Sequence, residues 1–300
     1  MIDGLLVVDK PAAWTSHDVV AKLRGATRQR RVGHAGTLDP DATGVLLVGL
    51  GRVTRLMRFL QETTKEYRGV VAFGVATSTL DAAGEELARV EMPVTETDVR
   101  TAMTAFVGDI DQVPPMVSAL KVDGRRLHEL AREGKEVERA PRPVHIDRYE
   151  LEAFEPGPFP RATVLVECSS GTYVRTLAAD LGTALGGHAH LASLRRLRVG
   201  AFTLAEATAL EQLLADPTPF VLSPADALRG MERIAVDAAT ASLVATGRVF
   251  TDPPFPVAGP GPFALVDDRG RLLAVYERRD AGLKPSVVIP VDAPPDGGGD

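Results

Sequence analysis

The run from Gly33 to Gly44 constrains the fold of this chain most, because it places turn-forming residues between two apolar segments. Its glycines can adopt backbone angles that other residues avoid, and Pro40 fixes its own φ while restricting Asp39 before it. The run therefore predicts a shaped loop. An isolated Asp-Pro pair is usually a simple turn. A rigid loop that presents one carboxylate is instead typical of an active site, and Asp39 is the candidate group.

Apolar periodicity predicts strands and helices on both sides of this run. Thr15 and Asp18 have the spacing of a capping box at the start of a helix, and Thr95 begins a second helix of the same kind. Further helices are expected over 53–60 and 173–185. The segments predicted as strands or extended chain are 5–8, 45–50, 67–76, 144–154, 162–168, 191–203, 263–266, 272–276 and 286–289.

Proline and charge patterns divide the chain into parts. Residues 114–143 combine proline, glycine and dense mixed charge, which predicts an exposed, mobile insertion. Three prolines between 216 and 224 precede a fresh pattern of helix and strands, so a boundary is expected near 230. We therefore expect a large domain over 1–228, a small β-rich domain over 229–292 and a disordered tail over 293–300.

Basic residues gather around the 33–44 run although the net charge of the chain is -6. Between Asp18 and Arg58, eight basic residues face three acids, and between Arg175 and Arg198, four arginines face one acid. An acidic body with such a basic stripe fits a surface that binds a polyanion. Tyr67 and Tyr173 stand in polar surroundings near this stripe, which suits the stacking of an unpaired base.

Several classes of protein are excluded or disfavoured. Cys168 is the single cysteine, which rules out an internal disulfide and a cysteine-based metal site. No apolar stretch reaches the ~20 residues of a membrane span, and the N-terminal residues do not resemble a signal peptide, so a cytoplasmic protein is expected. The glycine-rich run lacks the endings of phosphate-binding and dinucleotide-binding loops. No metal and no cofactor are expected.

Five motifs occur in a recognisable order: Asp9-Lys10-Pro11 with Thr15-Ser16, the 33–44 run, Lys65-Glu66-Tyr67-Arg68, the segment from Ser169 to Thr176, and Leu194-Arg195-Arg196-Leu197. Together they resemble the TruB-type tRNA pseudouridine synthases of bacteria, over Gly4 to Thr203. Ala13 departs from the family pattern, which usually has glycine two residues after the Lys-Pro pair, and this leaves the geometry of that turn open.

This resemblance implies a fold and an activity. The fold would be α+β, with a central mixed, largely antiparallel sheet flanked by helices, and the C-terminal part would be a small PUA-like domain. The activity would be isomerisation of one uridine of the tRNA T-loop, at position 55, to pseudouridine, without cofactor or metal. The partner would be tRNA, with no membrane involved, and the protein would act as a monomer.

The resemblance also implies roles for individual residues. Asp39 would be the catalytic carboxylate, acting on the base or on the ribose, and Arg175 would pair with it and lower its pKa. Tyr67 would stack on the target base and is the candidate for removing its C5 proton. Tyr173 and Leu194 would line the pocket.

Other residues would contact the RNA. His34 would fill the gap that the flipped base leaves. Lys10 is expected to bind RNA, and residues 114–143 would form a thumb-like loop in which Lys121, Arg125 and Arg126 contact phosphates.

Three other functions are compatible with parts of the sequence. A non-catalytic tRNA-binding protein or chaperone fits the basic stripe and the C-terminal part, but a carboxylate held against a polyanion weakens such binding. A pseudouridine synthase acting on another RNA is a second alternative. A nucleoside hydrolase is disfavoured because no second carboxylate is placed to assist Asp39.

Overall fold

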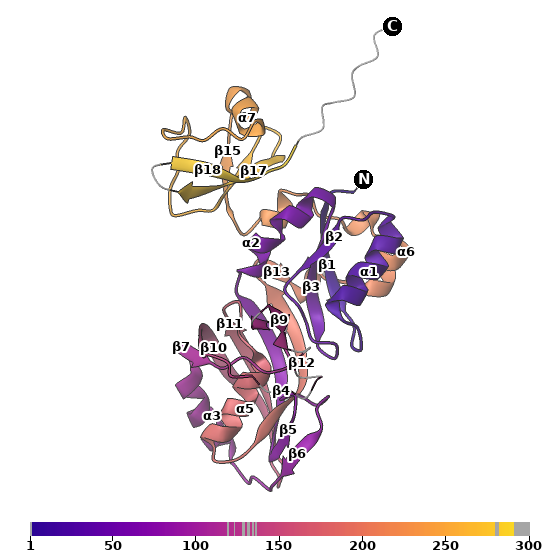
Figure 1. The fold of residues 1–300 in the computed structure, drawn as a ribbon, viewed down its shortest axis with the longest axis vertical. Helices are drawn as coiled ribbons and strands as arrows, with labels where there is room; N and C mark the ends of the chain where they lie inside the picture. Colours follow the sequence, from indigo (N-terminus) through magenta and orange to yellow (C-terminus); the bar gives the residue numbers. More distant parts are fainter. Residues whose placement is uncertain are drawn as a thin grey trace.

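The computed structural model describes residues 2–118, 120–122, 124–127, 130, 133, 135, 137–279 and 282–290. Within these residues the chain forms a ten-stranded sheet, a separate four-stranded sheet and two short hairpins (Figure 1). The predicted disordered tail over 293–300 lies outside the described residues, as do parts of the predicted insertion.

The large sheet is mixed and mainly antiparallel, as expected. Its strands are β1 (Gly4–Lys10), β2 (Val32–Ala35), β3 (Thr43–Leu50), β4 (Lys65–Phe73), β7 (Gly108–Gln112), β10 (Arg142–Glu155), β11 (Arg161–Cys168), β12 (Ala189–Val199), β13 (Phe202–Thr203) and β14 (Thr208–Ala209). They lie in the order β14-β1-β3-β12-β4-β11-β10-β7, with β2 beside β3 and β13 beside β12. The parallel pairs are β1 with β14 and β3 with β12.

Helices flank this sheet, so the expected α+β class is confirmed. They are α1 (Ser16–Thr27), α2 (Met57–Gln61), α3 (Glu96–Met103), α5 (Val174–Ala184) and α6 (Leu210–Ala215), with shorter 3-10 turns η1 (Gly51–Leu56), η2 (Thr104–Phe106), η3 (Leu204–Glu206), η4 (Thr218–Phe220) and η5 (Asp226–Leu228). Both predicted capping boxes are present, at Thr15 with Asp18 and at Thr95 with Asp98. The helix predicted over 53–60 begins instead as η1 and becomes α-helical only at Met57.

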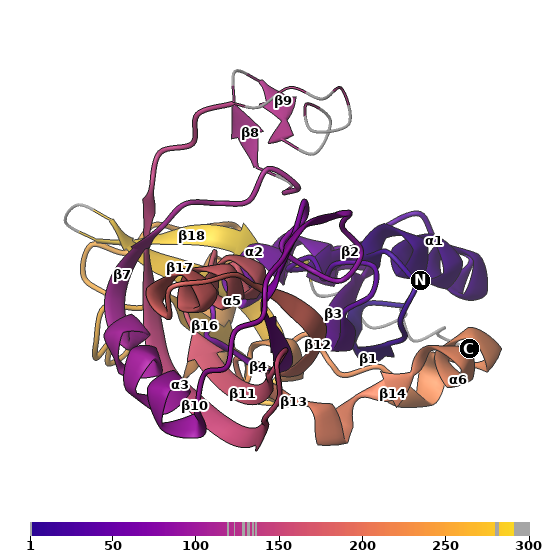
Figure 2. The ribbon, with the colours of Figure 1, turned by 90° about the horizontal axis from the view of Figure 1, so that it is seen from below.

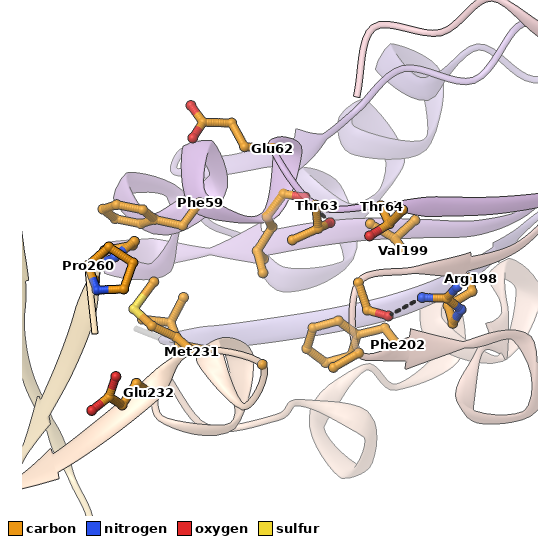
Figure 3. A pocket seen from close by; sticks show the side chains of 17 residues that line it. Phe59, Glu62, Thr63, Thr64, Arg198, Val199, Phe202, Met231, Glu232 and Pro260 are labelled. Carbon is orange, nitrogen blue, oxygen red and sulfur yellow. Dashed lines mark hydrogen bonds between the residues drawn. The ribbon is translucent and has the colours of Figure 1, made fainter. Parts of the chain in front are cut away.

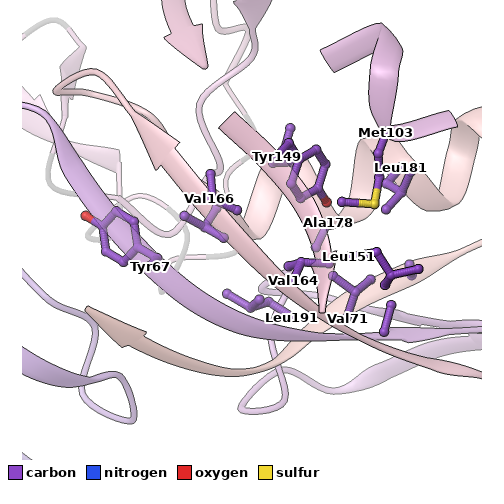
Figure 4. Close-up of a cluster of buried hydrophobic side chains, with 14 of the residues drawn as sticks. Tyr67, Val71, Met103, Tyr149, Leu151, Val164, Val166, Ala178, Leu181 and Leu191 are labelled. Atoms are coloured by element: carbon purple, nitrogen blue, oxygen red, sulfur yellow. The ribbon is translucent and has the colours of Figure 1, made fainter. Parts of the chain in front are cut away.

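Two apolar cores hold the helices against the two ends of the sheet. In one, Val71 and Val164 of the sheet pack with Met103 of α3 and Leu181 of α5 (Figure 4). In the other, α1 and α6 cover β1 and β3 through buried aliphatic side chains, namely Leu6, Val8, Val19, Leu23, Leu46, Val48 and Leu213. The segment between β2 and β3, which contains Asp39, packs Leu38 and Ala42 into the first of these cores.

The C-terminal residues form a smaller sheet of β15 (Glu232–Ala235), β16 (Phe263–Val266), β17 (Leu272–Arg279) and β18 (Gly282–Val288), accompanied by α7 (Ala238–Ala245). The boundary predicted after residue 228 falls between η5 and β15. This sheet has its own core, and its other face shares a core with η1, where Leu272 and Val275 join Val53 and Leu56. The two parts of the molecule therefore share buried apolar surface.

Three arginines on one side of the 51–61 segment bind this small sheet. Arg55 donates a 2.7 Å hydrogen bond to the carbonyl of Val288, and Arg52 donates to the carbonyl of Pro290. Arg58 binds the Ser286 hydroxyl and, at 3.3 Å, a carboxylate oxygen of Glu277. These arginines, which the sequence placed in a basic stripe, therefore contact the C-terminal sheet.

Two hairpins project from the large sheet. One consists of β5 (Val75–Thr77) and β6 (Glu86–Arg89). The other consists of β8 (Lys121–Val122) and β9 (Arg125–Arg126), lies within the predicted insertion, and stands away from the sheet (Figure 2).

Candidate active site

The 33–44 run begins as a strand and becomes a loop only at Gly36. Gly33 and His34 belong to β2, which pairs with β3, so the prediction of a loop throughout the run is wrong at its start. Gly36 has a φ of +78° and Gly44 a φ of +99°. A Cβ at Gly44 would lie 2.2 Å from the carbonyl oxygen of Arg196, because β3 and β12 approach closely there. Glycine is therefore required where the loop returns to the sheet.

Two buried side chains below the loop fix its backbone. The Ser16 hydroxyl, at the start of α1, accepts from the amide of Leu38 at 3.0 Å and donates to its carbonyl at 3.3 Å. The ammonium group of Lys10 donates to the carbonyls of Pro11, Trp14 and Pro40 at 2.6–2.8 Å. Burial lowers the pKa of Lys10 to about 8.

Lys10 is completely covered by protein, so the prediction that it binds RNA directly is wrong. The sequence around Lys10, a lysine on a strand next to a proline, does not indicate whether its side chain faces solvent. The tertiary packing determines that it is buried.

Asp39 and Arg175 form a two-pronged ion pair. Arg175 Nε lies 3.0 Å from Asp39 Oδ2, and Arg175 Nη2 lies 3.1 Å from Asp39 Oδ1. The arginine is in the first turn of α5 and only 5 % of its side chain is exposed, whereas 41 % of the Asp39 side chain is exposed. A bidentate arginine fixes both the position and the orientation of a carboxylate. Only the family resemblance predicted this pair from the sequence, because Asp39 and Arg175 lie 136 positions apart.

Arg175 is itself held by three further acceptors. It donates to the carbonyls of Thr79 at 3.1 Å and Val117 at 2.9 Å, and it lies 3.4 Å from a carboxylate oxygen of Asp81. One arginine therefore connects the Asp39 loop, the turn before β6 and the beginning of the insertion. Sequence reasoning missed Asp81, because it lies in an ordinary-looking turn with no motif spacing to Asp39.

The pKa of Asp39 is raised above its ordinary value, with burial as the main cause. Arg175 acts in the expected direction and lowers this pKa, but its effect is smaller than that of burial. The nearby charges of Asp81 and Asp41 raise the pKa further. Arg175 therefore lowers the pKa of Asp39 as expected, and partial burial of the carboxylate outweighs it.

A small cavity of about 140 Å³ opens beside this ion pair. It is lined by Asp39, Pro40, Asp41, Ala42, Asp81, Ala82, Ala83, Arg175, Leu191, Ala192, Ser193 and Leu194. Leu194 thus lies where predicted, on the wall next to Asp39. A cavity of about this size accommodates one six-membered ring.

A larger cleft of about 620 Å³ lies elsewhere, between the 59–64 segment and the C-terminal sheet (Figure 3). Phe59, Phe202 and Met231 supply apolar surface there, and Glu62 and Glu232 supply negative charge. None of the predicted site residues lines this cleft, whereas Asp39, Arg175 and Leu194 line the smaller cavity.

The two predicted tyrosines lie outside the lining of the small cavity. Tyr67, on β4, is largely buried, and its hydroxyl points away from the apolar cluster (Figure 4). Tyr173 directly precedes α5, and Gln112 of β7 fixes its backbone, accepting from its amide at 2.7 Å and donating to its carbonyl at 3.1 Å. Sequence reasoning missed Gln112, since no local pattern links it to a residue 61 positions away.

His34 lies on β2 with its ring edge-on to His17, at 5.3 Å between ring centroids. Its Nδ1 is buried and has no hydrogen-bond partner among the described residues. Burial, aided by the charges of His17 and Arg196, lowers the pKa of His34 to about 4. The ring is therefore neutral at physiological pH and can stack on bases without a desolvated charge.

The three predicted phosphate contacts lie on the β8–β9 hairpin. Lys121 and Arg126 occupy paired positions in its two strands. Arg125 is exposed and forms an ion pair with Glu133. The hairpin and the Asp39 site are connected along the chain through Val117, which accepts from Arg175.

Comparison with known proteins gives a consistent result. Residues 24–174 match the model of the TruB family pseudouridylate synthase N-terminal domain, and residues 175–228 match the tRNA pseudouridylate synthase B C-terminal domain. A tRNA pseudouridine synthase B of Rhodococcus jostii is 47% identical over 291 residues, which cover 96% of this chain and 93% of that protein. That of Symbiobacterium thermophilum is 51% identical over 247 residues, 82% of each chain.

Solved structures share the fold at lower identity. A Cbf5-Nop10-Gar1 complex matches with a TM-score of 0.75 and 23% identity, covering 96% of this chain and 85% of that one. An H/ACA RNP bound to a substrate RNA matches with a TM-score of 0.72 and 22% identity, covering 98% and 86%. The mixed sheet with an aspartate loop between its two halves is thus the pseudouridine synthase fold. The chain belongs to the TruB family of pseudouridylate synthases.

Proposed function

We propose that this chain converts one uridine of the tRNA T-loop, at position 55, to pseudouridine, with Asp39 as the catalytic carboxylate. Family membership makes the chain an isomerase, and its relatives are named tRNA pseudouridine synthases. The observation that carries the role of Asp39 is its bidentate pair with a buried arginine at the mouth of a cavity that accommodates one ring.

The reaction rearranges one nucleotide without adding or removing atoms overall. The bond between N1 of uracil and C1′ of ribose breaks, the freed base turns, and a bond forms between C5 and C1′. C5 loses its proton and N1 gains one. Because atoms and electrons balance within the substrate, the reaction itself calls for no redox cofactor, ATP or metal ion.

Asp39 must be ionised at the start, whether its carboxylate adds to the uracil ring or attacks the ribose. Arg175 supports that state, since its guanidinium favours the negative charge and fixes both oxygens. Burial has the opposite effect on the pKa and makes the carboxylate a stronger nucleophile when it is ionised.

The target base must leave the folded T-loop before it can reach Asp39, at a cost of a few kcal/mol in lost stacking. His34, whose neutral ring projects from β2, would fill the gap that the flipped base leaves. Tyr67 would stack on the base and remove its C5 proton. Leu194 lines the cavity, and Tyr173, which precedes Val174 and Arg175 of α5, would complete the wall once the base is bound.

RNA binding would use the projecting hairpin as well as the site. Lys121, Arg125 and Arg126 are the proposed phosphate contacts, which makes binding sensitive to salt. Arg125 would exchange its pairing with Glu133 for a phosphate. No described helix has the length and apolar character needed to cross a membrane. A cytoplasmic location and a monomeric state are part of the proposal.

The test replaces Asp39 with Asn in the full chain. We expect D39N to form no pseudouridine in an unmodified tRNA transcript while it still binds that transcript, because the amide keeps the shape of the side chain and loses its charge. Pseudouridine is mapped by position, and binding is measured by filter retention. Near-normal turnover by D39N refutes the assignment of Asp39.

The same assay separates the alternatives. A non-catalytic RNA chaperone would leave wild-type reactions without pseudouridine, and an enzyme for another RNA would modify a different transcript. A single modified position in the T-loop is the result expected here.

A further inference from the structure

Arg196 is a fully buried arginine without an acidic partner. Its side chain is 1 % exposed and is the largest of the fully buried side chains in the described chain. No carboxylate of the described residues lies within 4.0 Å of its guanidinium, in contrast to Arg175, Arg195 and Arg198, which all pair with acids. A buried cation is costly when nothing compensates its charge, and an apolar side chain would pack there at lower cost.

The guanidinium joins the proposed catalytic loop to the sheet. Its Nε donates to the carbonyl of Val45 at 2.6 Å, and its two terminal nitrogens donate to the carbonyls of Gly36 at 3.2 Å and Thr37 at 3.4 Å. Arg196 also lies opposite Tyr67 in the antiparallel pair of β12 and β4, so the two side chains share one face of the sheet. The Arg196 side chain therefore contacts the loop that carries Asp39 and comes from the position opposite Tyr67 on β4.

Tyr67 lies in surroundings that oppose its ionisation. Burial raises the pKa of its hydroxyl, and the charges of Cys168 on β11 and Asp39 on the loop raise it further. Arg196 on β12, opposite Tyr67 in the sheet, is the group whose positive charge lowers this pKa. Only the ionised tyrosine can accept a proton from carbon, because a neutral phenol is a very weak base.

We propose that Arg196 is a positioning residue for the removal of the C5 proton. Its positive charge stabilises the Tyr67 phenolate, and this phenolate takes the proton from C5 of the rotated base. This inference rests on the proposed function and deepens it. It gives a reason for an arginine with no acid among the described residues, because a paired carboxylate would cancel the charge on which the phenolate depends.

The step balances as follows. Once C5 is bonded to C1′, the phenolate oxygen of Tyr67 takes the proton from C5, and the electron pair of the C5–H bond returns to the ring to restore its double bond. Tyr67 is then a neutral phenol and releases its proton to solvent before the next turnover. Arg196 gains and loses nothing.

The experiment compares two tRNA transcripts in single-turnover reactions. In one, tritium at C5 of uridine is released as water when C5 is deprotonated. In the other, 5-fluorouridine replaces uridine, so the base can be cleaved and rejoined through C5 but has no C5 proton to lose. Consumption of 5-fluorouridine is measured by nucleoside chromatography after digestion.

For Arg196→Gln we expect tritium release at neutral pH to fall by about 10-fold to 100-fold, as for loss of a nearby charge. Consumption of 5-fluorouridine should also fall, because Arg196 binds the loop that carries Asp39, but by at least about fivefold less than tritium release. The rise of tritium release with pH should move to more alkaline pH, and Arg196→Lys should restore part of the loss. Equal losses with both transcripts overturn the inference, because they indicate a purely structural role.

Lys65→Met is the matched control. Lys65 is also a buried cation without an acid, donating to the carbonyls of Gln61 and Thr63, and it does not bond to Tyr67. The ratio of the two transcript rates should be unchanged in this variant, and a shift as large as in Arg196→Gln overturns the inference. A wild-type enzyme that releases no tritium refutes the proposed function instead.

Discussion

Among single residues, Ala13 has the backbone of a glycine. Its φ is +63°, in the left-handed region that costs an L-residue about 1–2 kcal/mol. The sequence leaves the geometry of this turn open, because alanine stands where the pattern of the resembled family usually has glycine. In the structure Ala13 adopts the left-handed conformation that glycine favours, and the fold therefore contains a locally strained residue.

We predict that Ala13→Gly stabilises the protein by about 0.5–1 kcal/mol. The relief of strain exceeds the added chain entropy of glycine in the unfolded state, which is about 0.5–1 kcal/mol. Urea unfolding measures the difference. A loss of stability would mean that this turn is not strained.

The pair of Asp39 and Arg175 gives a prediction for pH dependence. In the proposed reaction Asp39 acts when it is ionised, and burial raises its pKa, so activity should fall on the acid side at a higher pH than for an ordinary aspartate. Arg175→Gln removes the main group that lowers this pKa. The acid limb of the pH-rate profile should then move up by about 1–3 pH units, with lower activity throughout.

Single-turnover rates from pH 5 to 9 test this, and circular dichroism confirms that the variant is folded. An acid limb that stays in place would show that Asp39 does not govern the profile.

Among elements, the parallel contact of β3 and β12 determines where the Asp39 loop ends. Gly44 lies opposite Arg196 in this pair, and a side chain at Gly44 would collide with the neighbouring backbone. The loop therefore depends on one close approach between strands that are about 150 residues apart in the sequence.

We predict that Gly44→Ala lowers the free energy of unfolding by about 3–5 kcal/mol, from the strained φ and the backbone clash together. Gly25→Ala is the control, because Gly25 lies in α1 with nothing within 4 Å of an added Cβ. That variant should be stabilised by about 0.5–1 kcal/mol. Similar effects from both would contradict the proposed role of the strand contact.

For the whole molecule, two kinds of contact join the C-terminal sheet to the body. The arginines of the 51–61 segment are partly exposed, and exposed ion pairs contribute about 0–1 kcal/mol. The shared apolar core includes Leu272, which is 4 % exposed, and truncating such a side chain costs about 2–5 kcal/mol. Apolar contact should therefore dominate.

We predict that Leu272→Ala increases hydrogen exchange in 263–288 far more than Arg58→Ala does. Exchange followed by mass spectrometry measures both variants, with the α1 amides as an internal reference. The reverse order would show that the arginines carry the attachment.

The sequence by itself determined the local features of this protein. Both capping boxes, most strand segments and the glycine-bounded loop follow from the spacing of residues within a dozen positions, where backbone geometry acts directly. The order of motifs also identified the family. These features depend on short-range sterics and hydrogen bonding, so no knowledge of distant contacts was needed.

Only the tertiary structure decided which charges are buried and what they touch. Lys10 is buried beneath the loop, and Arg58 contacts the C-terminal sheet. Arg196 has no acid beside it among the described residues. Asp81 joins the Asp39 site from a turn with no recognisable motif. Burial and pairing of a charge depend on which distant strands lie side by side, and that pairing arises only when the whole sheet is assembled.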